Sequence, residues 1–152
     1  MYLIRCVLIL VICIVPLASC KVGNDNINKV VIETSVGSNH IFQVQIANTP
    51  EKWERGLMFV EYLPKDHGML FYYDENKPQS FWMKNTLISL DVIFIKENGK
   101  ISNIHHMAVP LDEETKLPSL GSIVAALEVN GGTAAKLGIK AGDVVKHPFF
   151  KK

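Results

Sequence analysis

The chain has 152 residues, of which 16 are Lys or Arg and 15 are Asp or Glu, so its formal net charge is +1 at pH 7. A nearly neutral chain without a basic stripe is a poor candidate for a nucleic-acid-binding protein. All three cysteines lie near the start of the chain, at Cys6, Cys13 and Cys20. If Cys20 is lipidated, the mature domain has no free thiol, which excludes a cysteine nucleophile, a CxxC redox motif and a cysteine zinc site.

Residues 1–19 have the pattern of a signal peptide that ends in a lipobox. Arg5 supplies a positive charge, and the unbroken apolar run over 6–15 is too short to span a bilayer comfortably. The run ends in Leu17-Ala18-Ser19-Cys20, where small residues fit a signal peptidase and only a thiol can take thioether-linked diacylglycerol. The sequence therefore predicts a lipid anchor on Cys20. The alternative is an ordinary signal peptide with a chance cysteine.

Lipidation makes Cys20 the first residue of the mature protein and predicts a periplasm-facing protein of the bacterial cell envelope. Lys21 stands where an inner-membrane-retaining Asp is sometimes found, which favours the outer membrane over the inner membrane. Removing the leader removes Arg5, so Lys plus Arg then equals Asp plus Glu in number. The predicted partners are the membrane, through the lipid, and a small molecule or an envelope protein, but not nucleic acid.

Residues 20–29 are polar and are predicted to be a tether, and 30–152 to be a single β-rich domain. Two short helices are expected, one starting at Thr49 as N-cap with Pro50 in the first helical position, and one over 133–137 before Gly138. Turn residues separate most of the apolar or alternating segments, with Asn98-Gly99 as the strongest hairpin signal and loops over 74–78 and 110–118. Eight strands are predicted, over 29–34, 40–46, 68–73, 80–84, 90–96, 100–107, 122–129 and 144–146.

These elements predict a mainly β fold, a compact antiparallel β-sandwich or barrel with one or two short helices. The motifs T-P-E (49–51), G-L-M (56–58), H-G-M-L-F (67–71), F-W-M-K-N-T (81–86), L-D-V-I-F-I (90–95), L-E-V (127–129) and G-I-K-A-G-D (138–143) resemble the bacterial and archaeal family called domain of unknown function 192. The resemblance spans roughly 30–147. It implies a mostly β fold and frequent export, but no activity, because none is established for the family.

The segment S-F-W-M-K-N-T over 80–86 is the main candidate for a site. In a strand, Phe81 and Met83 point to one face while Trp82 and Lys84 point to the other. One interpretation places Phe81 and Met83 in the core, with Trp82 packed under a loop beside Lys84. The other interpretation makes Trp82 the aromatic floor of a pocket with polar groups on its rim. The candidate pocket residues are Trp82, Lys84, Asn85, Thr86, Asp91 and Glu128.

Asp91 and Glu128 each place a carboxylate within an apolar run, so each needs a partner or a raised pKa. A backbone amide or Lys84 is the structural partner expected for Asp91. The alternative role for either carboxylate is that of a general acid or base.

Three functions remain open from the sequence. The first is a binding or accessory module without enzymatic activity, and the second is an enzyme that uses Asp91 or Glu128 with Lys84 or His67. The third is a Cu(I) carrier, because methionine thioethers and histidines are soft ligands in an exported protein. The residues considered for copper are Met58, Met69, Met83 and Met107 with Trp82, His67 and His105. Methionine is also an ordinary core residue, and the sequence predicts no cofactor and assigns no metal ligand.

Overall fold

The computed structural model describes residues 27–150, so the predicted signal peptide, the lipid attachment at Cys20 and most of the predicted tether lie outside the described residues. The described chain is mainly β, as predicted, with two short α-helices and a closing 3-10 helix. The elements in order are β1 Lys29–Glu33, β2 Asn39–Ala47, α1 Pro50–Arg55, β3 His67–Lys77, β4 Ser80–Phe81, β5 Leu90–Ile95, β6 Ile101–Ala108, β7 Leu117–Pro118, β8 Ile123–Asn130, α2 Thr133–Leu137, β9 Val144–Lys146 and η1 Pro148–Phe150.

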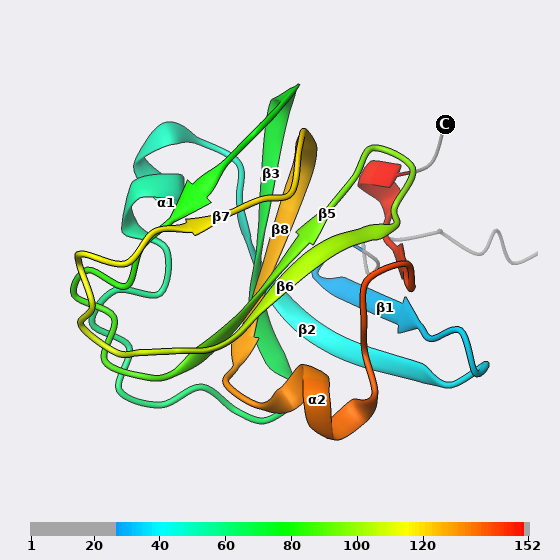
Figure 1. The fold of residues 1–152 in the computed structure, drawn as a ribbon, viewed down its shortest axis with the longest axis horizontal. Coiled ribbons are helices and arrows are strands. Elements are labelled where there is room, and N and C mark those ends of the chain that lie inside the picture. Colours follow the sequence, from blue (N-terminus) through cyan, green and yellow to red (C-terminus); the bar gives the residue numbers. More distant parts are fainter. Residues whose placement is uncertain (1–26, 151–152) are drawn as a thin grey trace, which may run out of the picture.

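Seven strands form one curled sheet in the order β6-β5-β8-β3-β2-β1-β9, and β4 pairs with β7 in a separate two-stranded sheet. The curl gives a half-barrel (Figure 1). The strand pairs are antiparallel except β2 and β3, which run parallel. The parallel pair departs from the antiparallel prediction because α1 and the segment after it carry the chain back across the sheet between these strands.

The two outer strands of the curled sheet, β6 and β9, meet at one end through an isolated bridge between Lys100 and Val144. There the backbone N–H of Ile101 donates to the Asp143 carbonyl at 2.9 Å. Further along β6, the Ser102 hydroxyl donates to the Leu120 carbonyl at 2.8 Å. The segment around Leu120 therefore covers a part of β6 that β9 does not reach.

The curled sheet buries apolar side chains on both faces. An inner core fills the concave side, and its largest members come from β1, β2, β3, β5 and β8: Val30, Ile32, Phe42, Leu70, Ile93, Ile95 and Leu127. An outer core lies between the opposite face of β3, β5 and β8 and a layer made of α1 and the loops at 56–63, 81–88 and 108–117. Its main members are Leu57, Met69, Phe71, Met83, Leu90, Val92 and Phe94.

Both predicted helices are present with the predicted caps. The Thr49 hydroxyl accepts a hydrogen bond from the Lys52 N–H at 3.4 Å, and Pro50 occupies the first turn of α1. Gly138 ends α2 with a φ of +69°, a left-handed conformation that glycine adopts without a Cβ clash. Local capping chemistry thus fixed these boundaries.

Three predicted boundaries differ from the structure by more than one residue. The strand predicted over 80–84 stops at Phe81, because the chain turns at Asn85, which has a left-handed φ of +53°. The turn predicted over 74–78 is mostly strand, since β3 resumes pairing with β8 at Lys77 after an irregularity. The loop predicted over 110–118 ends in the short strand β7, which pairs with β4.

Within residues 27–150, no helix has the length and apolar character needed to cross a membrane.

Candidate functional site

The segment over 80–86 forms a strand end followed by a turn that presents Trp82 and Lys84 outwards. Met83 is buried in the outer core, and Phe81 packs edge-on against Phe71 with ring centroids 5.0 Å apart. Asn85 lies in the left-handed region, which Asn tolerates better than most residues, and the Thr86 N–H donates to the Met83 carbonyl at 3.1 Å. Phe81 and Met83 thus take the core positions that the structural interpretation predicted.

Trp82 is 38 % exposed, and two ammonium groups lie near its ring. Nζ of Lys84 is 5.2 Å from the centroid of the indole ring, and Nζ of Lys116 is 4.7 Å from it. Each contact is a cation–π interaction, worth about 0.5–1 kcal/mol at an exposed site. The indole is therefore an accessible surface that is electrostatically paired with cations.

The loops on either side hold the 82–86 turn in place through backbone hydrogen bonds. The Phe59 N–H donates to the Asn85 carbonyl at 2.8 Å, and the Leu111 N–H donates to the Thr86 carbonyl at 3.0 Å. Phe59 and Leu111 both have a φ of +63°. A left-handed conformation costs a residue with a Cβ about 1–2 kcal/mol, so three loops carry strain where they meet at this turn.

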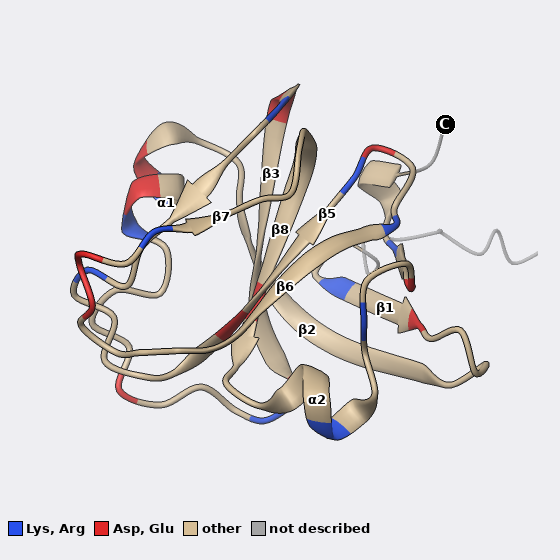
Figure 2. Ribbon diagram, in the orientation of Figure 1, with Lys and Arg blue, Asp and Glu red and all other residues tan. Residues whose placement is uncertain are grey.

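Two hollows lie beside the end of α1 and the turn that follows it. The Trp82 hollow, about 380 Å³, is lined by Glu51, Glu54, Arg55, Met58, Trp82, Lys84 and Asn85. It brings together three of the six residues predicted for a pocket, Trp82, Lys84 and Asn85. Its lining contains both acidic and basic groups, and Figure 2 shows both charge types on and beside α1.

Thr86, the fourth predicted pocket residue, is buried and does not line the Trp82 hollow. Its hydroxyl donates to the Lys84 carbonyl at 3.2 Å. This hydrogen bond lies within the turn, so Thr86 helps to hold the backbone of Lys84 in position.

Asp91 is fully buried on the inner face of β5, at the end of the half-barrel that α2 covers. Its Oδ1 accepts the N–H groups of Met107 at 2.8 Å and Gly132 at 2.9 Å, and its Oδ2 accepts the N–H of Ala134 at 2.7 Å. Nδ1 of His106 lies 4.0 Å from Oδ1. The partner predicted as a backbone amide is present, and the hydrogen bonds tie α2 and the end of β6 to β5.

Glu128 lies on β8, next to Asp91 in the sheet but on its opposite face. Its register partners are Val92 on β5 and Met69 on β3, both in the outer core. The side chain is buried, and within residues 27–150 its Oε2 has no hydrogen-bond partner. Burial raises the pKa of Glu128 to about 8, so the carboxyl is largely protonated at neutral pH.

The second hollow is distinct from the Trp82 hollow, although Arg55 and Met58 line both, and Glu128 is not among its lining residues. This Gly56 hollow has a volume of about 410 Å³ and is lined by Gln45, Ile46, Ala47, Lys52, Arg55, Gly56, Leu57, Met58, Val60 and Met69. A Cβ placed on Gly56 would lie 3.8 Å from Oε2 of Glu128. The carboxyl therefore reaches the underside of the turn that forms part of this hollow.

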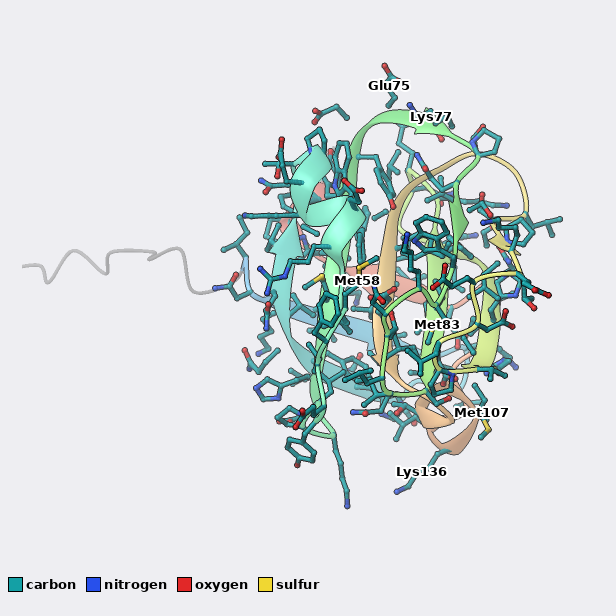
Figure 3. All side chains as sticks on the ribbon, turned by 90° about the vertical axis from the view of Figure 1, so that its left-hand side faces the viewer. Met58, Glu75, Lys77, Met83, Met107 and Lys136 are labelled. Carbon is teal, nitrogen blue, oxygen red and sulfur yellow. The ribbon has the colours of Figure 1, made fainter. Side chains whose placement is uncertain are left out.

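The methionines considered for copper do not form one group. Met58 and Met69 line the Gly56 hollow, Met83 is buried, and Met107 is 63 % exposed. Figure 3 shows Met58, Met83 and Met107 at separate places on the side of the molecule that carries α1. In the described part of the chain, no group of three or more His, Cys, Asp or Glu side chains is placed to hold a metal ion.

The histidines of the copper hypothesis have other contacts. His67 Nδ1 lies 2.8 Å from a carboxylate oxygen of Asp66, and His105 Nε2 lies 2.8 Å from the Pro118 carbonyl. The copper carrier stays a prediction from the sequence.

Several lining residues were missed by the sequence reasoning. The available signal was a spacing of three, four and seven residues, which would place four side chains on one side of a helix: Glu51, Glu54, Arg55 and Met58. Lys116 lies far along the chain from Trp82, and no local pattern connects the two.

Comparison with known proteins gives the chain a family and a fold. Residues 31–147 match the family DUF192, described as "Uncharacterized ACR". A crystal structure from Sinorhizobium meliloti 1021, titled a "putative transcription regulator", is 38% identical with a TM-score of 0.77, and the match covers 80% of this chain and 93% of that one. A protein of unknown function from Novosphingobium aromaticivorans DSM 12444 is 42% identical with a TM-score of 0.75, over 78% of this chain and 83% of that one.

Among curated proteins, none matches the chain. The family match and the motifs read from the sequence nevertheless agree over the same residues, and the β fold is that of the two solved structures. The chain belongs to the DUF192 family.

Proposed function

We propose that this protein is a small-ligand-binding or accessory module of the bacterial envelope, anchored by lipid on Cys20, with the Trp82 hollow as its binding site. The observation that carries the proposal is an exposed indole on a strained turn that two strained loops hold in place. Backbone strain persists only where the surrounding structure enforces it, and it concentrates at ligand-binding positions. The strain here fixes the orientation of Trp82 and Lys84.

The charges around the hollow define the chemical class of ligand. Glu51 and Glu54 supply acidic groups to the lining, and Lys84 and Arg55 supply basic groups. A polar ligand with both a positive and a negative group, such as an amino acid or a short peptide, complements this wall. A ligand that carries charge of only one sign would be repelled by the lining residues of the same sign.

The equal numbers of basic and acidic residues in the predicted mature chain support a partner other than nucleic acid. The solved structure that is named a regulator therefore supports only the fold of this chain. The proposed binding activity rests on the Trp82 hollow.

The binding site is tested by NMR of ¹⁵N-labelled protein, in which each tryptophan gives one indole N–H signal. Pools of amino acids and dipeptides should shift the Trp82 signal. The Trp53 signal should stay, because that indole N–H is held by the Ala47 and Tyr72 carbonyls at 2.9 and 3.1 Å. Trp82→Ala should abolish binding.

Leu120→Ala is the matched control, since Leu120 is 73 % exposed and lines neither of the two hollows. Binding that survives Trp82→Ala, or the absence of a Trp82 shift with every probe, would contradict the proposed site.

The anchor is tested separately by fractionation. Cys20→Ser should move the protein from the membrane fraction to the soluble periplasmic fraction. Several acyl chains anchor a protein stably in a bilayer, whereas a protein surface of near-zero net charge does not bind a bilayer stably. Retention of the variant in the membrane fraction would count against lipidation. Recovery of the wild-type protein in the inner-membrane fraction would contradict the outer-membrane assignment but not the lipid anchor.

A further inference from the structure

A third hollow, the Trp53 pocket, lies where α1 meets the C-terminal end of β3. It has a volume of about 250 Å³ and is lined by Trp53, Tyr73, Asp74, Glu75, Lys77 and Gln79. None of these residues lines the Trp82 hollow or the Gly56 hollow. Its volume is below the usual range for drug-sized ligands, so the Trp53 pocket suits a single small group.

Two aromatic rings form the fixed part of the Trp53 pocket. The ring centroids of Trp53 and Tyr73 lie 5.1 Å apart, and the ring planes are tilted by 50°. The indole N–H donates to the carbonyls of Ala47 and Tyr72 at 2.9 and 3.1 Å, and Tyr73 is buried in the outer core. Both rings are therefore held in place without a ligand, so binding requires little ordering of these side chains.

An irregularity in β3 supplies the acidic residues of the pocket. From Tyr72 to Lys77, β3 advances five residues, while its partner β8 advances two, from Ala125 to Ile123. The two acidic lining residues lie in this stretch, which departs from regular pairing with β8. Bulges redirect side chains and are common next to functional sites. The irregularity therefore adds carboxylates to a pocket whose fixed part is aromatic.

The charges of the Trp53 pocket favour a cation. Nζ of Lys77 lies 2.8 Å from Oε2 of Glu75, so these two charges offset each other. Within residues 27–150, Asp74 has no ion-pair partner, and its carboxylate gives the lining a net negative charge. Figure 3 shows Glu75 and Lys77 together at one end of the molecule. A cation in the pocket therefore meets two aromatic rings and an available carboxylate.

We propose that the Trp53 pocket binds a quaternary ammonium ion, whose methyl groups lie against Trp53 and Tyr73 while its charge faces Asp74. The face of an aromatic ring attracts a cation, and tryptophan attracts it most strongly. A quaternary ammonium has no N–H donor, so an aromatic wall leaves no donor of the ligand without a partner. The site goes beyond the proposed function, because it shares no lining residue with the Trp82 hollow and takes a different ligand.

The polar groups of the lining also set the selectivity. A primary ammonium has three N–H donors and needs an acceptor for each. Glu75 and Lys77 already pair with each other, which leaves the Asp74 carboxylate and the Gln79 amide for a ligand. An anion would be repelled by Asp74. The pocket should therefore prefer a quaternary ammonium to a primary one and reject an anion.

The test is calorimetric titration of the purified full chain with choline. Two matched probes are dimethylbutanol, the uncharged isostere in which carbon replaces the nitrogen, and ethanolamine, which carries a primary ammonium. Choline should bind at least about tenfold more tightly than either, because only choline combines the charge with an apolar surface for the rings. Failure of choline to bind, or equal binding of all three probes, would overturn the proposal.

Variants at exposed positions assign the charges. Asp74→Asn should weaken choline binding about threefold or more, because it removes the carboxylate that faces the ligand. Lys77→Gln removes the opposing charge and should strengthen binding about twofold. Glu113→Gln, at an exposed position that lines none of the three hollows, is the matched control and should leave binding unchanged. Equal binding to the wild type and Asp74→Asn would overturn the proposal.

The indole N–H signals separate this site from the Trp82 hollow. Choline should shift the Trp53 signal and leave the Trp82 signal in place, and Trp82→Ala should not change choline binding, so the two proposals fail independently. Trp53→Leu should weaken choline binding about tenfold, and Trp53→Phe should weaken it less, because phenylalanine keeps a ring. A choline-induced shift of the Trp82 signal alone would overturn the proposal.

Quaternary ammonium groups occur both as free ions and on lipid headgroups, and vesicles distinguish the two sources. The soluble Cys20→Ser protein is mixed with vesicles of phosphatidylcholine or of phosphatidylglycerol. Recruitment to phosphatidylcholine alone, reversed by choline, would assign a headgroup as the ligand. Choline binding without recruitment would assign a free ion. Recruitment to both vesicle types without any choline binding would overturn the proposal.

Discussion

Asp91 and Glu128 occupy adjacent strands of one sheet, yet they have opposite surroundings. Asp91 lies opposite Val129, and Glu128 lies opposite Val92, so the two carboxyl groups point to opposite faces. On the inner face, at the end of the half-barrel, loop and helix N–H groups converge on Asp91. On the outer face, Glu128 is surrounded by apolar side chains. Burial alone therefore does not determine what a carboxyl does; the supply of N–H donors on its face of the sheet does.

Asp91→Asn should produce the largest loss of stability. The amide presents N–H groups toward backbone N–H donors and carries no charge, and each hydrogen bond to a charged acceptor is worth about 1.5–3 kcal/mol. We expect the free energy of unfolding to fall by roughly 3–5 kcal/mol, measured by urea denaturation.

Asp112→Asn is the control for Asp91, because this carboxylate accepts the N–H groups of Glu114 and Thr115 in exposed hydrogen bonds. It should cost about 1 kcal/mol or less. Equal effects at the two positions would show that burial adds nothing to the value of the Asp91 contacts.

Glu128→Gln should act in the opposite direction. The pKa of Glu128 is raised from 4.5 to about 8 in the folded protein, so the folded state binds an extra proton between these values. The contribution of Glu128 to stability is therefore fully present below about pH 4.5 and is lost as the pH rises through about 8. Above that pH, the variant should be more stable than the wild type by a few kcal/mol.

The pH dependence is read from urea midpoints of wild type and Glu128→Gln across the same pH range. Glu75→Gln provides an exposed control, since the Glu75 carboxylate pairs with Lys77 at 2.8 Å on the surface. If the wild type and Glu128→Gln lose stability in parallel, then Glu128 is not the titrating group.

Asn85→Ala should have the smallest of the three effects and extends the comparison to the strained turn. Alanine tolerates a φ of +53° less well than asparagine, so we expect the free energy of unfolding to fall by about 1 kcal/mol. Asn85→Gly should be close to neutral, because glycine adopts this conformation freely while losing more chain entropy. A loss for Gly as large as for Ala would assign the effect to a side-chain contact of Asn85.

Local chemistry made much of the fold predictable. The helix caps at Thr49 and Gly138 and the Asn98-Gly99 turn are encoded within a few residues, and each appears where expected. The parallel pairing of β2 with β3 depends on the position at which the chain returns to the sheet after its crossover, and no short sequence pattern specifies that position. The predicted strand over 80–84 ends early at the turn around Asn85, where the Met83 N–H donates to the Asp112 carbonyl at 3.0 Å, a contact between distant segments.

The candidate site was predictable in part for the same reason. Trp82, Lys84 and Asn85 share a hollow because they are neighbours in the sequence. Asp91 and Glu128 were identified by charge within apolar runs, but the sequence could not tell which of them would receive donors. That distinction depends on Met107, Gly132 and Ala134, which come from segments beyond β5.

The covered edge of β6 bears on how the protein behaves when crowded. An unpaired strand edge can template pairing with another molecule and lead to aggregation. Here Ile101 bonds to Asp143 at the start of β6, and Ser102 and Asn103 bond to Leu120 further along. Under the proposed lipid anchoring, copies of the protein would be concentrated on a membrane surface, and the occupied start of the β6 edge would limit pairing between copies there.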